Sequence, residues 1–150
     1  MLRRTTGAAA AVLLALPLAL FLVESARAAD PNLDGDWEIT SGMKDGEDLP
    51  MPAPDAGKVV MTFKGDTLTA KIGDMTHTAT IKTDPSKKPA TLDLTPQDGP
   101  DKGKNGLCIY DIKDDVLRLC IAEPGRDRPT DFTSKKGSGW TLITMKRAKK

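Results

Sequence analysis

The fold is decided by the stretch Leu33-Asp34-Gly35-Asp36-Trp37-Glu38-Ile39, which places a glycine two residues before a tryptophan. This Gly-x-Trp motif lies where the first strand of a folded domain should begin. A glycine lets the incoming chain pass close beneath one end of a small barrel, and the indole that follows can close that end. The alternative interpretation is an ordinary core tryptophan at the start of a strand.

The amino-terminal segment has the features of a secretory signal peptide. Two arginines precede an apolar run over residues 8–23, and a small-residue motif ends at Ala28, where we expect cleavage. The alternative is a retained membrane anchor, but the run is short for a membrane span and contains Pro17. We therefore expect a signal peptide over residues 1–28 and a secreted or periplasmic domain over residues 29–150.

The composition of the expected mature domain excludes some partners. Its 122 residues suffice for one core, and it keeps 19 of the 22 basic and 20 of the 21 acidic side chains, so its net charge is near −1. Because both signs are interspersed, the domain lacks the basic face that nucleic acid or an anionic membrane surface requires. We expect it to bind no nucleic acid and, after signal cleavage, no membrane.

The body of the chain alternates polar and apolar residues with period two, and glycine, aspartate and proline interrupt it about every 8 to 12 residues. This pattern predicts an all-β domain. The eight expected strands are 36–41, 58–64, 67–72, 75–83, 90–95, 107–112, 116–122 and 140–147. Eight antiparallel strands in sequence order close most simply into an up-and-down barrel, which leaves no exposed edge.

Two tight turns, Gly65-Asp66 and Gly73-Asp74, fix the register of the central strands. The first turn brings Phe63 opposite Leu68, and the second pairs residue 72 with residue 75. Alternation then turns Met75, His77, Ala79 and Ile81 inward and Thr76, Thr78, Thr80 and Lys82 outward. The single histidine of the chain is therefore predicted to lie on the inner face.

The same alternation defines the whole inner face. Its expected members are Trp37, Ile39, Met61, Phe63, Leu68, Ala70, His77, Ala79, Ile81, Leu92, Leu94, Tyr110, Leu117 and Leu119. A barrel of eight strands is either filled by its side chains or holds one small ligand, and both interpretations stay open. The candidate ligand-binding residues of the lumen are Trp37, Met61, Phe63, His77, Tyr110 and Leu119, with His77 and Tyr110 as polar anchors.

Two cysteines, Cys108 and Cys120, lie on the two strands of an expected hairpin in a compartment that permits disulfides. A three-residue turn over 113–115 would pair them directly on one face, where they can bond. A two-residue turn at Lys113-Asp114 would offset them by one residue and point them to opposite faces. We favour the offset register, because it places Tyr110 on the same face as the leucines of the next strand.

The residue groups that carry catalysis or bind metals are mostly absent from the sequence. One histidine cannot form a His-rich site, and the two cysteines lack the Cys-x-x-Cys spacing typical of zinc. Ser138 lies in Gly-Ser-Gly without a strand-to-helix elbow or a second histidine as base. We therefore predict no enzymatic activity, no catalytic residue, no metal and no cofactor.

Several motifs together resemble one known family. They are Gly35-Asp36-Trp37, Met61-Thr62-Phe63-Lys64-Gly65-Asp66, the segments 84–89 and 98–104, Ile109-Tyr110, Leu117-Arg118-Leu119-Cys120, the segment 129–132 and Gly137-Ser138-Gly139. In this combination the chain resembles the small lipocalin-like domain of unknown function found in planctomycete-type exported proteins. The resemblance implies a secreted or periplasmic lipocalin-like barrel with no established ligand and no catalytic residues. It also implies that a basic residue of the last strand, Lys146 or Arg147, stacks over the indole of Trp37.

Two function classes follow from these expectations. The first is a barrel that binds a small apolar or amphipathic molecule in its lumen. The alternative is a protein-interaction or structural module of the cell envelope that acts through its mouth loops, 42–57 and 123–139. The first of these loops carries Pro50, Pro52 and Pro54 and is long enough to lie across one mouth.

Overall fold

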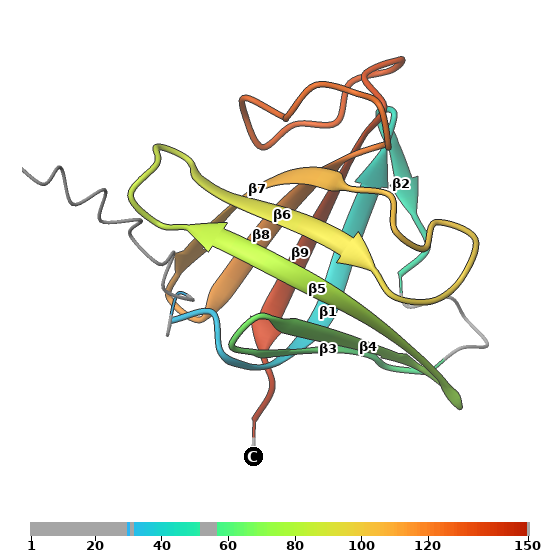
Figure 1. Cartoon of the computed structure of the whole chain (residues 1–150), viewed down its shortest axis with the longest axis vertical. Coiled ribbons are helices and arrows are strands. Elements are labelled where there is room, and N and C mark those ends of the chain that lie inside the picture. Colours follow the sequence, from blue (N-terminus) through green and yellow to red (C-terminus); the bar gives the residue numbers. More distant parts are fainter. Residues whose placement is uncertain (1–29, 31, 52–56, 150) are drawn as a thin grey trace, which may run out of the picture.

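The computed structural model describes residues 30, 32–51 and 57–149, which form a closed, eight-stranded antiparallel up-and-down β-barrel with one additional short strand (Figure 1). The strands are β1 (Gly35–Lys44), β2 (Glu47–Leu49), β3 (Val59–Lys64), β4 (Thr67–Ile72), β5 (Met75–Asp84), β6 (Ala90–Pro96), β7 (Gly106–Lys113), β8 (Val116–Ala122) and β9 (Trp140–Arg147). The predicted signal peptide lies outside the described residues. Within them, no helix has the length and apolar character needed to cross a membrane.

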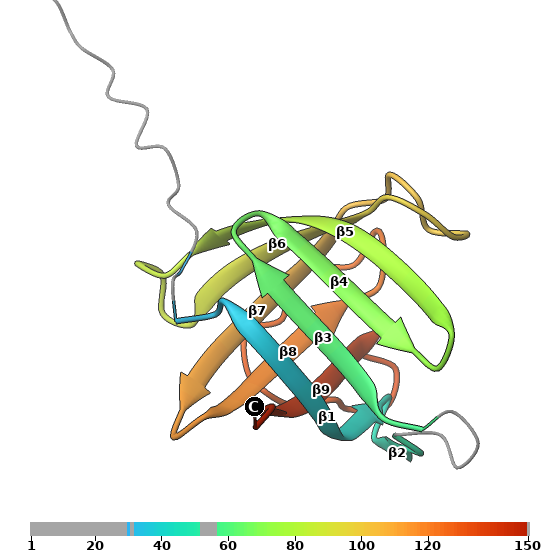
Figure 2. The same cartoon turned by 90° about the horizontal axis from the view of Figure 1, so that it is seen from below.

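Strand β1 closes the barrel. It pairs with β3 from Gly35 to Glu38 and with β9 along most of its length, so it lies between these two strands (Figure 2). A bulge between Ile39 and Ser41 shifts the register of its pairing with β9. Such a bulge bends a strand, and here it separates the part of β1 that pairs with β3 from the part that pairs with β2.

The connection predicted over 42–57 is partly wrong. Strand β1 continues to Lys44 and forms a short hairpin with β2, in which Gly42 pairs with Leu49. The bulge explains the difference, because it places two consecutive exposed residues, Thr40 and Ser41, in the strand and interrupts the alternation on which the prediction depended. Residues 52–56 of the predicted connection, with Pro52 and Pro54, lie outside the described residues.

The register of the central strands is confirmed. Phe63 pairs with Leu68, and Ile72 pairs with Met75 across the second turn. Gly65 and Gly73 have φ angles of 60° and 59°, a left-handed conformation that glycine adopts without steric cost.

The β7–β8 turn differs from the prediction by one residue. Its central residues are Asp114 and Asp115, both with positive φ, instead of Lys113 and Asp114. Aspartate tolerates this conformation better than lysine, which explains the position of the turn. The predicted consequence for the cysteines holds: Cys120 pairs with Ile109, the neighbour of Cys108, and both thiols are free.

A cluster of buried side chains forms the core inside the barrel. Its buried members are Leu33, Trp37, Ile39, Val59, Phe63, Leu68, Ala79, Ile81, Leu92, Cys108, Tyr110, Leu117, Leu119, Ile143 and Met145. Met61 and Leu94 pack against this cluster with part of their surface exposed. Of the residues predicted to point inward, Met75 and His77 are exposed. Both residues lie at the start of β5, where the strand reaches the end of the barrel.

A second buried layer lies outside the barrel, under the connection between β8 and β9. Ile109 and Cys120 point outward from β7 and β8 yet have 1% and 0% of their surface exposed. The thiol of Cys120 contacts the Thr133 carbonyl oxygen at 3.5 Å, and the Arg128 guanidinium donates to the Cys108 carbonyl at 2.7 Å. The connection over 123–139 therefore covers part of the outer wall.

Candidate functional site

One end of the barrel is closed by Trp37. Its indole has no exposed surface, and its Nε1 donates a hydrogen bond of 2.8 Å to the Leu33 carbonyl. The Arg147 guanidinium carbon lies 4.2 Å from the ring centroid, so Arg147 is the basic residue that stacks over the indole. Gly35 has a φ of 130°, a backbone conformation that residues with a side chain rarely adopt, and a Cβ at this position would also lie 2.9 Å from Arg147 Nη1.

Tyr110 belongs to this closed end. Its hydroxyl donates a hydrogen bond of 2.9 Å to Asp30 Oδ2, while Asp30 Oδ1 accepts the amide of Asn32 at 2.9 Å. Burial, followed by the hydrogen bond to Asp30, raises the pKa of the Tyr110 hydroxyl. Tyr110 thus holds the entering segment, which contains Asp30 and Asn32 and leads into β1.

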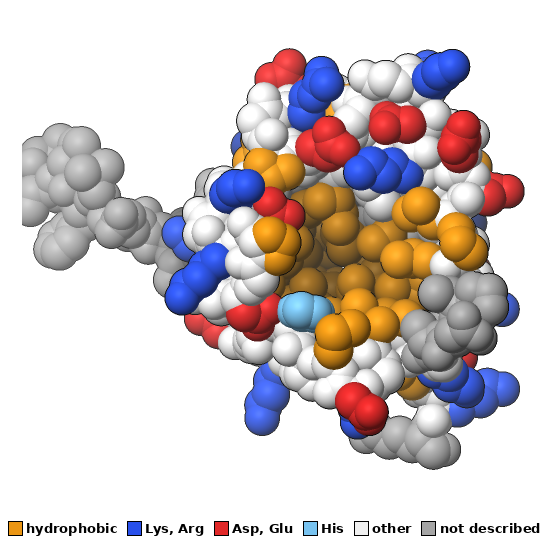
Figure 3. Space-filling model, turned by 90° about the vertical axis from the view of Figure 1, so that its right-hand side faces the viewer, with side chains coloured by type: hydrophobic (Ala, Val, Ile, Leu, Met, Phe, Trp, Pro, Cys, Tyr) orange, Lys and Arg blue, Asp and Glu red, His pale blue; other side chains and the backbone are white. Residues whose placement is uncertain are grey.

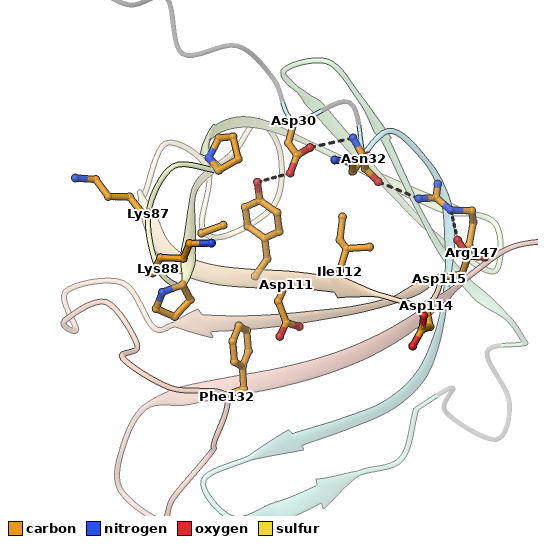
Figure 4. A pocket seen from close by; sticks show the side chains of 14 residues that line it. Asp30, Asn32, Lys87, Lys88, Asp111, Ile112, Asp114, Asp115, Phe132 and Arg147 are labelled. Atoms are coloured by element: carbon orange, nitrogen blue, oxygen red, sulfur yellow. Dashed lines mark hydrogen bonds and ion pairs between the residues drawn. The ribbon is translucent and has the colours of Figure 1, made fainter.

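An open recess of about 970 Å³ lies beside this closed end (Figure 4). Lys87, Lys88, Asp111 and Phe132 are among its lining residues. Asp111 pairs with Arg118, whose guanidinium carbon lies 4.3 Å from the Phe132 ring centroid. Because both cations and carboxylates line this recess, it favours no single ligand charge.

The opposite end of the barrel is open. Figure 3 shows a hollow lined by hydrophobic side chains at this end, with the single histidine on its rim. A cavity of about 290 Å³ lies here, between the inner faces of β3 to β6 and the loop that follows β6. Its lining comprises Met61, Leu68, Ala70, His77, Thr78, Ala79, Leu94, Pro96, Asp98, Gly99, Pro100 and Asp101.

Two alanines, Ala70 and Ala79, line the cavity. Met61, Ala70 and His77 form one row across β3, β4 and β5, because Ala70 pairs with both of the others. In the next row toward the closed end, Leu68 pairs with Ala79. The small side chains at 70 and 79 leave space that the larger neighbours Met61 and Leu68 do not fill. The cavity is therefore a property of the sequence at these two inward positions.

A polar pair, His77 and Asp98, lies at the rim of the cavity. His77 Nδ1 lies 2.6 Å from Asp98 Oδ1, and the backbone amide of Thr78 donates to Asp98 Oδ2 at 2.8 Å. The hydrogen bond from His77, together with that from the Thr78 amide, lowers the pKa of the Asp98 carboxyl. The side chains of His77 and Asp98 remain 48% and 41% exposed, so both are accessible from the mouth.

The loop that supplies Asp98 is held against the barrel. The amide of Gln97 donates to the Thr78 carbonyl at 2.8 Å, and the amide of Gly103 donates to the Pro96 carbonyl at 2.9 Å. Asp101 forms an ion pair of 3.0 Å with Lys104 within the loop. These contacts fix the carboxylate of Asp98 beside the imidazole.

The structure separates the six candidate ligand-binding residues into two groups. Met61 and His77 line the cavity at the mouth, whereas Trp37, Phe63, Tyr110 and Leu119 are buried in the core. The two predicted polar anchors, His77 and Tyr110, line different recesses and are not brought together. Sequence reasoning missed Asp98, since its loop showed only turn residues and gave no sign that it folds back onto β5.

Comparisons of the chain with protein-family models, with curated proteins and with solved structures give no match. Over residues 30, 32–51 and 57–149, no three or more histidine, cysteine, aspartate and glutamate side chains form a group that could hold a metal ion. The geometry of the mouth is therefore the main basis for a functional proposal.

Proposed function

We propose that the protein binds a small apolar or amphipathic molecule in the cavity at the open mouth of its barrel. The observation that carries the proposal is an apolar recess of about 290 Å³ with one polar pair, His77 and Asp98, at its rim. Small-molecule sites typically combine apolar walls with a few placed polar groups, and their volumes begin at about 300 Å³. The apolar part of the ligand would contact Met61, Leu68 and Leu94, and its polar end would reach His77.

The size of the cavity limits the ligand. At about 30 Å³ for each non-hydrogen atom, the share of one molecule in liquid water, the cavity holds roughly ten such atoms. A medium-length alkyl chain with one polar group fits this volume. The part of the ligand that the cavity encloses is therefore smaller than a long-chain lipid.

We also propose that the chain is a lipocalin-like barrel of exported proteins and acts outside the cytoplasm. The closed eight-stranded barrel and the Arg147 guanidinium over Trp37 support the first statement. The predicted signal peptide supports the second. This placement would expose the cavity to small molecules of the envelope or the surrounding medium.

A titration with 1-octanol, followed by ¹H–¹⁵N NMR spectroscopy, tests the proposal. The amide signals of Ala70, His77 and Ala79 are expected to shift saturably, because these residues line the cavity. Signals at the closed end, such as that of Asn32, are expected to remain unchanged.

The matched control is Ala70→Leu, which fills cavity space in the row that Ala70 shares with Met61 and His77 and leaves both residues of the rim pair in the sequence. We expect this variant to keep a folded spectrum and to lose the saturable shifts. Equal shifts in the wild-type protein and in Ala70→Leu would contradict the proposed site.

A further inference from the structure

The hydrogen bonds of Asp98 determine which nitrogen of His77 carries the proton. Both carboxylate oxygens are occupied, Oδ1 by His77 Nδ1 at 2.6 Å and Oδ2 by the Thr78 amide at 2.8 Å. An ionised carboxylate can only accept hydrogen bonds, so the hydrogen of the first contact must belong to Nδ1. In the neutral imidazole, Nε2 then bears a lone pair and acts as an acceptor.

The acceptor nitrogen is available to a ligand. Among the residues that the structure describes, Nε2 of His77 has no hydrogen-bond partner, and the side chain lines the cavity while remaining 48% exposed. The group that meets Nε2 must therefore donate a hydrogen bond. A hydroxyl group does so without bringing a charge to the cavity.

The charges at the rim disfavour an anionic head group. Asp98 and Asp101 both line the cavity, Lys104 is paired with Asp101, and Lys102, whose charge acts on Asp98, is not among the lining residues. A ligand carboxylate at Nε2 would meet an acceptor nitrogen and lie close to the Asp98 carboxylate. Neither contact is favourable.

We infer that the mouth cavity selects a short amphiphile without an anionic group that donates a hydrogen bond from a hydroxyl group to Nε2 of His77. This inference rests on the proposed function and adds the chemical class of the ligand. Asp98 acts as a positioning residue, because it fixes the tautomer of His77 without contacting the ligand's hydroxyl group.

The test compares two isomers, 1-octanol and heptyl methyl ether, by the same NMR titration at pH 9, above the range in which histidine side chains ordinarily titrate. Both isomers have nine non-hydrogen atoms and no charge, but only the alcohol donates a hydrogen bond. The quantity measured is the ratio of their dissociation constants. Sodium octanoate, with a chain of the same length, is expected to bind more weakly than 1-octanol.

The decisive variant is Asp98→Asn. The Thr78 amide donates to the side-chain atom at this position, so the carbonyl oxygen of the new side-chain amide is expected to face Thr78 and its NH₂ group to face His77. Nδ1 of His77 would then accept, and Nε2 would carry the proton. We expect the preference for the alcohol over the ether to fall by about two- to tenfold, the factor that one net hydrogen bond supplies.

His77→Phe serves as a second variant, since it keeps an aromatic ring at the rim and removes the nitrogen. It is expected to lose the preference for the alcohol to the same extent. An unchanged ratio in Asp98→Asn and His77→Phe, or octanoate binding as tightly as 1-octanol to the wild-type protein, would overturn the inference while leaving the cavity as a binding site. If neither isomer shifts the cavity signals of the wild-type protein, the proposed function itself fails.

Discussion

The guanidinium group of Arg147 lies over the indole of Trp37, 4.2 Å from the ring centroid, and joins the last strand of the barrel to the first. The same group donates to the Asn32 and Asp34 carbonyls at 2.9 and 3.0 Å and pairs with Asp115 at 3.1 Å. One side chain therefore holds the entering segment, the closing indole and the β7–β8 turn together.

Replacing Arg147 by methionine is expected to lower the free energy of unfolding by about 1 to 3 kcal/mol, since both the cation–π contact and the backbone hydrogen bonds are lost. Urea denaturation measures the effect. The matched control is Lys146→Met, because Lys146 is the exposed neighbour on the same strand, and it should change stability by less than about 0.5 kcal/mol. Equal effects of the two substitutions would show that the position of Arg147 over Trp37 does not account for the loss of stability.

Tyr110→Phe tests the attachment of the entering segment. The substitution removes the hydroxyl that donates to Asp30 and leaves a largely buried carboxylate without this partner. We expect a loss of about 1 to 3 kcal/mol in urea denaturation. The binding of 1-octanol should be unaffected, because Tyr110 lines the other end of the barrel. A variant that keeps wild-type stability would contradict the role assigned to this hydrogen bond.

The two cysteines should remain thiols in an oxidising compartment, since adjacent residues of a strand point to opposite faces and Cys120 pairs with the neighbour of Cys108. A thiol titration of the unreduced, urea-unfolded protein is expected to find two reactive groups, and the folded protein should react slowly. Fewer than two reactive thiols after unfolding would contradict the prediction that Cys108 and Cys120 form no disulfide.

Stability should fall at alkaline pH. Burial raises the pKa of the Cys120 thiol from 9.0 to about 11 and also raises the pKa of Cys108. A raised pKa in the folded state gives stability that is complete below the unfolded-state pKa and is lost as the pH rises toward the folded-state value. The loss should therefore begin near pH 9, with up to about 1.4 kcal/mol per pH unit from each thiol.

Urea denaturation of the wild-type protein and of a Cys108→Ala, Cys120→Ala double variant between pH 8 and 10.5 measures this slope. The double variant should show a shallower decline, retaining the part due to Tyr110, whose pKa burial also raises. If the free energy of unfolding falls with the same slope in both proteins, the thiols are excluded as the cause of the alkaline loss of stability.

The parts of the barrel that could be predicted from the sequence are those fixed by local turn chemistry. Two Gly-Asp turns set the register of β3, β4 and β5, and period-two alternation then assigned the inner face. The same reasoning placed the β7–β8 turn one residue early, because it followed the apolar pattern and ignored that both central residues need positive φ. Local rules were sufficient only where a glycine marked the turn.

The rest depends on contacts between distant segments. Ile109 and Cys120 face outward and are buried only because the connection over 123–139 folds back over them. In the candidate site, alternation correctly placed His77 on the inner face, but its position at the mouth follows from the strand's end. Its partner Asp98 lies 21 residues away on a loop whose path depends on backbone hydrogen bonds to β5 and β6. Such folding back leaves no periodic signal in a sequence.

The most direct test of the central claim is a crystal structure of the protein grown with 1-octanol. We predict electron density for the alkyl chain over Ala70 and Ala79, with the hydroxyl oxygen within hydrogen-bond distance of Nε2 of His77. A structure in which the recess over Ala70 is filled by the protein's own side chains, or in which the alcohol binds only at the closed end, would contradict the account.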